Sequence, residues 1–125
     1  MTHILITNSL GTKVWTFNVP FSRGDIVKVK NCSACLTYSN IKSLFDVNDP
    51  NVMNPHDYPD SELKKRINQW KIVDFGANYC WELCILLKNR LGKYAVMVWT
   101  EKNQSIELLR KINKEEDNIL LSSKY

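Results

Sequence analysis

The chain has 125 residues, of which 44% are hydrophobic, and its formal net charge is +4. This length predicts a single domain over residues 1–125, and the apolar fraction is typical of a folded core rather than a disordered chain. Apolar runs such as Cys84 to Leu87 are too short to cross a bilayer, and no signal region opens the chain. An intracellular protein without a membrane partner is therefore predicted. Its small basic excess permits an anionic partner without requiring one.

The first nineteen residues predict a β-hairpin. Thr2 to Thr7 is β-branched and apolar, Asn8 to Gly11 supplies turn residues, and Lys13 to Val19 returns as the second strand. Alternate side chains of a strand share a face. One face of the second strand is therefore expected to carry a lysine and two aromatic rings: Lys13, Trp15 and Phe17.

A turn at Gly24 and Asp25 leads into a strand in which apolar and basic residues alternate. Its valines are expected on one face, and Lys28 and Lys30 on the other. We expect this strand to continue as far as Tyr38, and Ile41 to Val47 to form a further short strand.

Two helices are predicted in the second half of the chain. The first runs from Asp60 to Trp70, because Asp60 or Ser61 is a good N-cap and one apolar stripe follows it. The second runs from Ser105 to Leu121, with a stripe formed by three residues: Ile106, Leu109 and Ile112. Between the helices, two strands are expected at Tyr79 to Lys88 and Tyr94 to Trp99. The result is an α+β, mainly β, or small-barrel domain.

The four cysteines form a CxxC and a CxxxC pair: Cys32, Cys35, Cys80 and Cys84. Such pairs suggest zinc, but neither contains Gly or Pro, and a strand would hold Cys80 and Cys84 about 13 Å apart. Free thiols and no metal site are therefore predicted. Neither histidine lies in a nucleophile motif, and the four glycines form no phosphate-binding loop. We predict a non-catalytic protein without a cofactor.

The order of these elements resembles the first oligonucleotide-binding (OB) fold of the protection-of-telomeres family. The matching segments are Ile4 to Ile6, Lys13-Val14, Gly24 to Val27, Ser43 to Phe45, and the helix Asp60 to Trp70. Tyr79 to Cys84 and Val96 to Trp99 are similar to the opening hairpin of that family's second OB fold. The resemblance implies a small OB-like Greek-key barrel with two helices.

The chain departs from the family at one strand. The family's first OB strand would precede the hairpin, and this sequence begins too late to contain it. An open barrel exposes two backbone edges. We therefore expect the Tyr79 to Lys88 strand to fill the missing position by pairing with a strand among residues 2–47, which would make a rearranged barrel.

The resemblance implies that the ligand is G-rich single-stranded telomeric DNA and that the protein is nuclear. Basic and aromatic groups on adjacent strands also suit a single-strand groove, where cations contact phosphates and rings stack on bases. The predicted stacking residues are Trp15, Phe17 and Tyr38. The predicted phosphate contacts are Lys13, Lys28, Lys30 and Lys42.

Two other functions fit the same sequence. An adaptor OB fold would bind a protein partner at an exposed strand edge, which exposed aromatic residues and a modest charge also suit. As a separate alternative to base stacking, Trp15 and Phe17 would belong to the barrel core. A small microbial or phage regulatory protein, of the immunity or inhibitor type, would bind no nucleic acid.

Overall fold

The structure is a computed structural model, and it describes residues 1–30, 42, 44–48, 68–77, 81–102 and 106–122. These residues form two sheets, with strand orders β2-β1-β8 and β6-β5-β4-β3-β7. The strands are β1 (Thr2–Thr7), β2 (Lys13–Val19), β3 (Ile26–Val29), β4 (Trp70–Ala77), β5 (Leu83–Lys88), β6 (Tyr94–Trp99), β7 (Ile106–Arg110) and β8 (Asp117–Ser122).

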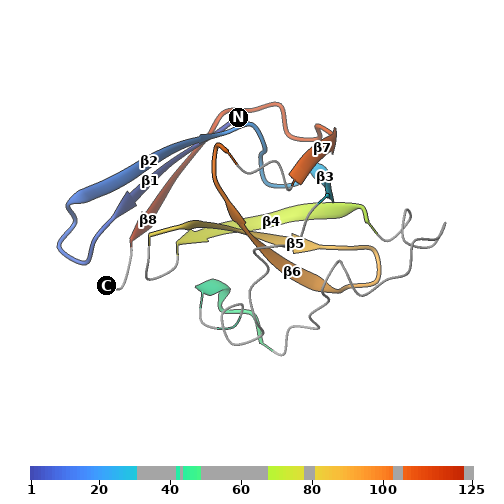
Figure 1. Cartoon of the computed structure of the whole chain (residues 1–125), viewed down its shortest axis with the longest axis horizontal. Helices are drawn as coiled ribbons and strands as arrows, with labels where there is room; N and C mark the ends of the chain where they lie inside the picture. The colour runs from blue at the N-terminus through green and yellow to red at the C-terminus, as the bar shows by residue number, and fades with distance from the viewer. Residues whose placement is uncertain (31–41, 43, 49–67, 78–80, 103–105, 123–125) are drawn as a thin grey trace.

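The three-stranded sheet joins the two ends of the chain. β1 and β2 form the predicted hairpin, and β8 lies parallel to β1 on its other side, as Figure 1 shows. On the outer face, the ring of His3 lies 2.8 Å from Asn18 Oδ1 and 2.5 Å from Glu116 Oε2, so it bridges both neighbours of β1. The hydrogen bond to Asn18, followed by the one to Glu116, raises the pKa of His3 above 6.5.

The five-stranded sheet is antiparallel throughout. A tight turn joins β5 to β6, in which Asn89 Oδ1 accepts hydrogen bonds from the N–H groups of Leu91 and Lys93. Gly92 takes a positive φ of 76° there, a conformation that glycine adopts without steric cost. β5 is buried on both faces and lies between β4 and β6, as its continuous apolar sequence predicts.

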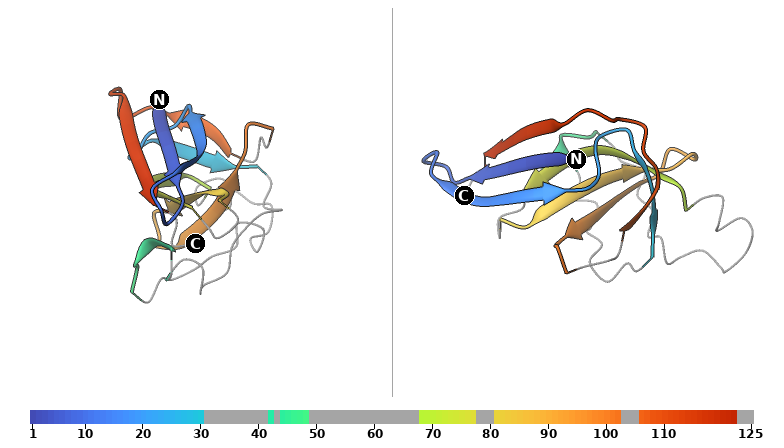
Figure 2. Two further views of the ribbon diagram at one scale, coloured as in Figure 1. Left: turned by 90° about the vertical axis from the view of Figure 1, so that its left-hand side faces the viewer. Right: turned by 90° about the horizontal axis from the view of Figure 1, so that it is seen from above.

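One core fills the space between the inner faces of the two sheets, which Figure 2 shows facing each other. β1 contributes Ile4 and Ile6, and the five-stranded sheet contributes Trp70 and Ile72 among others. A smaller apolar cluster covers part of the outer face of the larger sheet. There Phe45 lies over Gly76, where a Cβ atom would come within 2.9 Å of the Phe45 ring.

A buried carboxylate ties the connection before β3 to the connection after β7. Asp25 is fully buried, and its oxygens accept hydrogen bonds from Lys111 Nζ at 2.8 Å and from three backbone N–H groups. Those N–H groups belong to Ser22, Ile112 and Asn113, at 2.9, 2.9 and 3.0 Å. Burial by itself would raise the pKa of Asp25, but these hydrogen bonds lower it below its ordinary value.

The structure corrects the prediction of two helices. The segment from Ser105 to Leu121 contains β7 and β8 instead of a helix. Its helical stripe is not a buried face, because Leu109 and Ile112 are 43% and 58% exposed. Trp70 begins β4, and residues 60–67 of the other predicted helix lie outside the described residues. The described part of the chain is therefore nearly all β, and the α+β prediction is wrong.

The rearranged barrel is also wrong. The neighbours of β5 are β4 and β6, and neither lies among residues 2–47. The strand added beside β1 is β8, which the sequence predicted to be helical. No strand covers the described residues between 42 and 48, although Ile41 to Val47 was predicted to form one. The predicted extension of β3 to Tyr38 falls outside the described residues.

Candidate anion-binding surface

A register-aligned row of side chains crosses the outer face of the five-stranded sheet. Arg110 pairs with Ile26, Ile26 with Lys71, Lys71 with Lys88, and Lys88 with Tyr94. Directly paired residues of an antiparallel sheet project from the same face. We call these five residues the basic row. Trp70, Ile72 and Leu87 lie in the inner core, which places the neighbouring lysines on the outside.

The basic row contains a repulsive pair. Lys71 lies directly opposite Lys88, and like charges in this position destabilise a sheet. Among the described acidic residues, none forms an ion pair with Lys71, Lys88 or Arg110, nor with the nearby Arg90. Stability alone does not favour this arrangement, which makes the surface a candidate for binding a negatively charged ligand.

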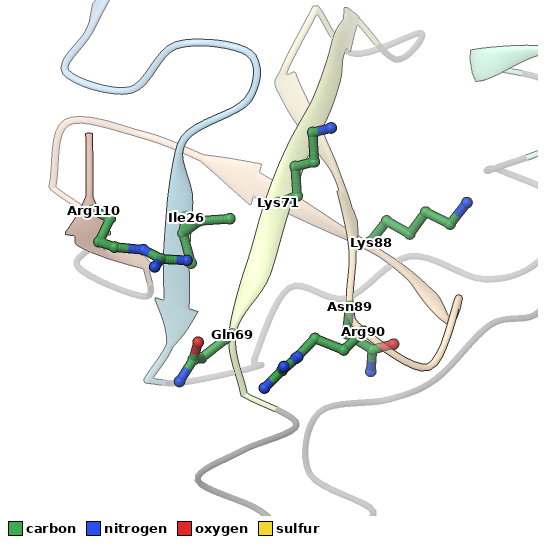
Figure 3. A pocket seen from close by; sticks show the side chains of 7 residues that line it. All are labelled: Ile26, Gln69, Lys71, Lys88, Asn89, Arg90 and Arg110. Carbon is green, nitrogen blue, oxygen red and sulfur yellow. The ribbon is translucent and has the colours of Figure 1, made fainter. Parts of the chain in front are cut away.

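Two hollows meet at this lysine pair. The first, of about 380 Å³, is drawn in Figure 3 and is lined by Ile26, Gln69, Lys71, Lys88, Asn89, Arg90 and Arg110. The second, of about 470 Å³, is lined by Arg23, Gly24, Lys71, Ile72, Val73, Lys88 and Tyr94. Lys71 and Lys88 line both hollows, so the two adjoin at this pair, and together we call them the basic track.

Cationic side chains reach the first hollow from separate elements of the sheet. In Figure 3, Arg90 extends from the turn after β5 toward Gln69 at the start of β4, and Arg110 lies beside Ile26. Lys71 and Lys88 project from adjacent strands. Cationic residues from β4, from β5, from the turn after it and from β7 therefore line this hollow, and in Figure 3 the ammonium ends of Lys71 and Lys88 point away from the two guanidinium groups.

A bulge and a glycine shape the second hollow. The pairing of β4 with β5 shifts between Ile72 and Asp74, which leaves Val73 as an extra residue and bends the strand. Beside it, the N–H of Gly24 donates to the carbonyl of Ile72 at 2.8 Å. Gly24 has a φ of 97° and carries no side chain, so the space above this contact stays open.

The structure places two of the predicted phosphate contacts beside the basic row. Lys28 lies on the outward face of β3, two residues from Ile26, while Val27 and Val29 are buried as expected. The ammonium groups of Lys28 and Lys30 lie 3.7 and 3.3 Å from the same Glu107 oxygen. These two lysines therefore share a side, but a carboxylate already neutralises part of their charge.

The other predicted residues lie elsewhere. Lys13, Trp15 and Phe17 belong to β2, whose hairpin tip is at the opposite end of the molecule from the β5–β6 turn in Figures 1 and 2. Trp15 is 53% exposed, whereas the ring of Phe17 packs edge-on against Trp99 at 6.3 Å between centroids. Lys42 is exposed and lies outside the eight strands, and Tyr38 is outside the described residues.

The sequence prediction missed Lys71, Lys88, Arg90 and Arg110. Lys71 directly follows the first predicted helix, and Arg110 lies within the second. A basic residue outside the apolar stripe of a helix is common and does not indicate a binding site. The alternation of Trp70, Lys71 and Ile72 was the available strand signal. Their alignment depends on strand register, which no local pattern specifies.

The described residues contain no cluster of three or more potential metal ligands. Cys84 is buried in the outer apolar cluster, and the other three cysteines lie outside the described residues. Over the same part of the chain, no helix is long and apolar enough to cross a membrane.

Comparison of the chain with protein-family models, with curated proteins and with solved structures finds no match. The inference of function therefore starts from the basic track.

Proposed function

We propose that this protein binds single-stranded nucleic acid, with the phosphates of the strand lying along the basic track. The observation that carries the proposal is the Lys71–Lys88 pair, which is repulsive, register-aligned and without an acidic partner among the described residues. A phosphate backbone supplies the missing negative charge and gains affinity through counterion release. Two joined hollows suit an extended chain better than one compact anion.

The preferred sequence of the ligand is a separate question. The resemblance to the protection-of-telomeres family supports G-rich telomeric DNA as the first probe and a nuclear location. On this proposal the protein holds a strand and catalyses no reaction.

A protein-interaction adaptor is a second candidate, and the three-stranded sheet favours it. In the part of the chain that the structure describes, β2 and β8 each have one neighbouring strand only, and such edges pair readily with other chains. A hollow of about 390 Å³ on this sheet is lined by His3, Ile4, Leu5, Thr16, Asn118, Ile119 and Leu120. Leu120 is 66% exposed there.

A titration with fluorescent oligonucleotides separates the two functions. The wild-type protein should bind single strands at low salt, and its affinity should fall as salt rises. Lys71→Ala combined with Lys88→Ala should weaken binding to every oligonucleotide alike, by at least about tenfold. It should also reduce the salt slope by about 1.4, because each lost phosphate contact accounts for about 0.7.

Lys102 provides a control outside the track, because it is exposed and follows Trp99, at the end of β6 that is distant from Tyr94. Lys102→Ala removes one positive charge and should leave the salt slope unchanged. Lys71→Gln should bind more weakly yet melt no lower than wild type, since it relieves a repulsion. If the wild type binds no oligonucleotide at low or moderate salt, the nucleic-acid proposal is wrong and the adaptor remains.

A further inference from the structure

The two hollows of the basic track differ in chemistry. Among the described residues, the first is lined by two lysines and two arginines and by no aromatic residue. The second is lined by Tyr94 and Val73, both of which pack against the outer apolar cluster. A phosphate suits the first set of groups, whereas the flat, weakly polar face of a base suits the second.

Tyr94 is held in place by its surroundings. The ring packs against the outer apolar cluster and is half-buried, so its position is fixed by contacts with the sheet. Lys88 Nζ lies 5.1 Å from the ring centroid. Lys88 also lines the first hollow, so this one side chain borders both the ring and the first hollow.

Arg23 forms the opposite side of the second hollow. Its guanidinium contacts Asp117 Oδ2 at 2.9 Å and lies 4.0 Å from Asp74 Oδ1. Two carboxylates therefore neutralise and orient this planar group before any ligand arrives. A fixed guanidinium plane can stack on a base without contributing a free charge.

We propose that the second hollow is a base-binding subsite, in which one base stacks on Tyr94 while its phosphate lies in the first hollow. This inference rests on the proposed function and makes it more specific, because the basic track would recognise a nucleotide unit and not any polyanion.

The test compares three probes: a single-stranded oligonucleotide, an abasic strand of the same length, and inorganic polyphosphate. The wild type should bind the oligonucleotide about 5- to 150-fold more tightly than the abasic strand, the range that one stacked base gives. Tyr94→Leu should weaken oligonucleotide binding toward the abasic level with an unchanged salt slope, because stacking releases no counterions. Tyr94→Phe should retain the wild-type preference.

Trp15→Leu is the control, because Trp15 is an exposed ring on β2, away from the track. It should leave all three affinities unchanged. Equal affinity of the wild type for oligonucleotide and abasic strand overturns the base subsite, even if Tyr94→Leu does not fold, and leaves phosphate binding intact. Absence of binding to all three probes overturns the proposed function together with the subsite.

Discussion

At the scale of single residues, Asp25 illustrates how one carboxylate can hold two distant segments together. It lies in the turn before β3, yet three of its four hydrogen-bond donors come from residues 111–113. A buried carboxylate with this many donors remains ionised, whereas the same group without them would become protonated or stay exposed. The Gly24-Asp25 turn predicted from the sequence therefore has two roles. Asp25 anchors two segments of the fold, and Gly24 leaves space open in the second hollow of the basic track.

We predict that Asp25→Asn lowers the free energy of unfolding by about 3–5 kcal/mol, because it leaves Lys111 without its buried partner. Urea denaturation at pH 7 measures this change. Asp74→Asn is the matched control: Asp74 is 47% exposed and lies 4.0 Å from Arg23, so its loss should cost about 1 kcal/mol or less. Equal stability losses in the two variants would contradict the anchor.

The same carboxylate predicts a pH dependence. The pKa of Asp25 is lower in the folded state, so the unfolded chain binds more protons and stability rises with pH. The contribution of Asp25 is present above its unfolded pKa of about 3.9 and is lost as the pH falls through the lower folded value. Asp25→Asn should accordingly remove part of the acid destabilisation of the wild type.

Glu107 provides a second prediction at this scale. Its carboxylate lies 3.7 Å from the ammonium group of Lys28 and 3.3 Å from that of Lys30, so under the proposed function it competes with phosphate for both lysines. We expect Glu107→Gln to tighten binding to single strands and to steepen the salt slope by up to about 1.4, since two lysines become available. Glu101→Gln, an exposed site after β6, controls for net charge. An unchanged slope in Glu107→Gln would exclude Lys28 and Lys30 from the interface.

At the scale of elements, β4 connects the core to the basic track. Trp70 is fully buried, and its Nε1 donates to Asn68 Oδ1 at 3.0 Å. The same Asn68 bonds both the N–H and the carbonyl of Val29, each at 2.9 Å. This bridge fixes β4 beside β3, and thereby positions Lys71 next to Ile26 in the basic row.

We predict that Trp70→Ala costs about 3–5 kcal/mol of unfolding free energy, because it removes a large fully buried side chain. Chemical denaturation followed by circular dichroism measures the loss. Trp15→Ala is the comparison: its ring is 53% exposed, and the cost should be clearly smaller. If the Trp70→Ala protein unfolds at the same denaturant concentration as the wild type, the prediction that this ring belongs to the core is wrong.

At the scale of the whole molecule, charge is distributed unevenly over a chain whose net charge is only +4. Arg23, Lys28, Lys30 and Lys111 are matched by carboxylates. The cations around the basic row have no such partner among the described residues. A small net charge is therefore compatible with a positive electrostatic field around the basic row. Anionic ligands are attracted by such local fields.

Local sequence patterns specify the hairpin of β1 and β2, the outward position of Lys28 in β3 and the burial of β5 on both faces. Each depends on local information: turn residues, alternation with a period of two, and a continuous apolar run. The tertiary structure decided the state of the C-terminal segment. Ile106, Leu109 and Ile112 fit a helical period, but pairing with β3 and β1 stabilises two strands there instead.

The position of the basic track also depends on the tertiary structure. Lys71, Lys88 and Arg110 are ordinary surface residues in their own segments, and only the pairing of β7, β3, β4 and β5 aligns them. Sequence periodicity specifies which face of a strand a residue occupies, but it does not specify which strand lies beside it. The neighbouring strand and the pairing register depend on the packing of the whole core. The candidate site therefore lies at residues that no sequence motif indicates.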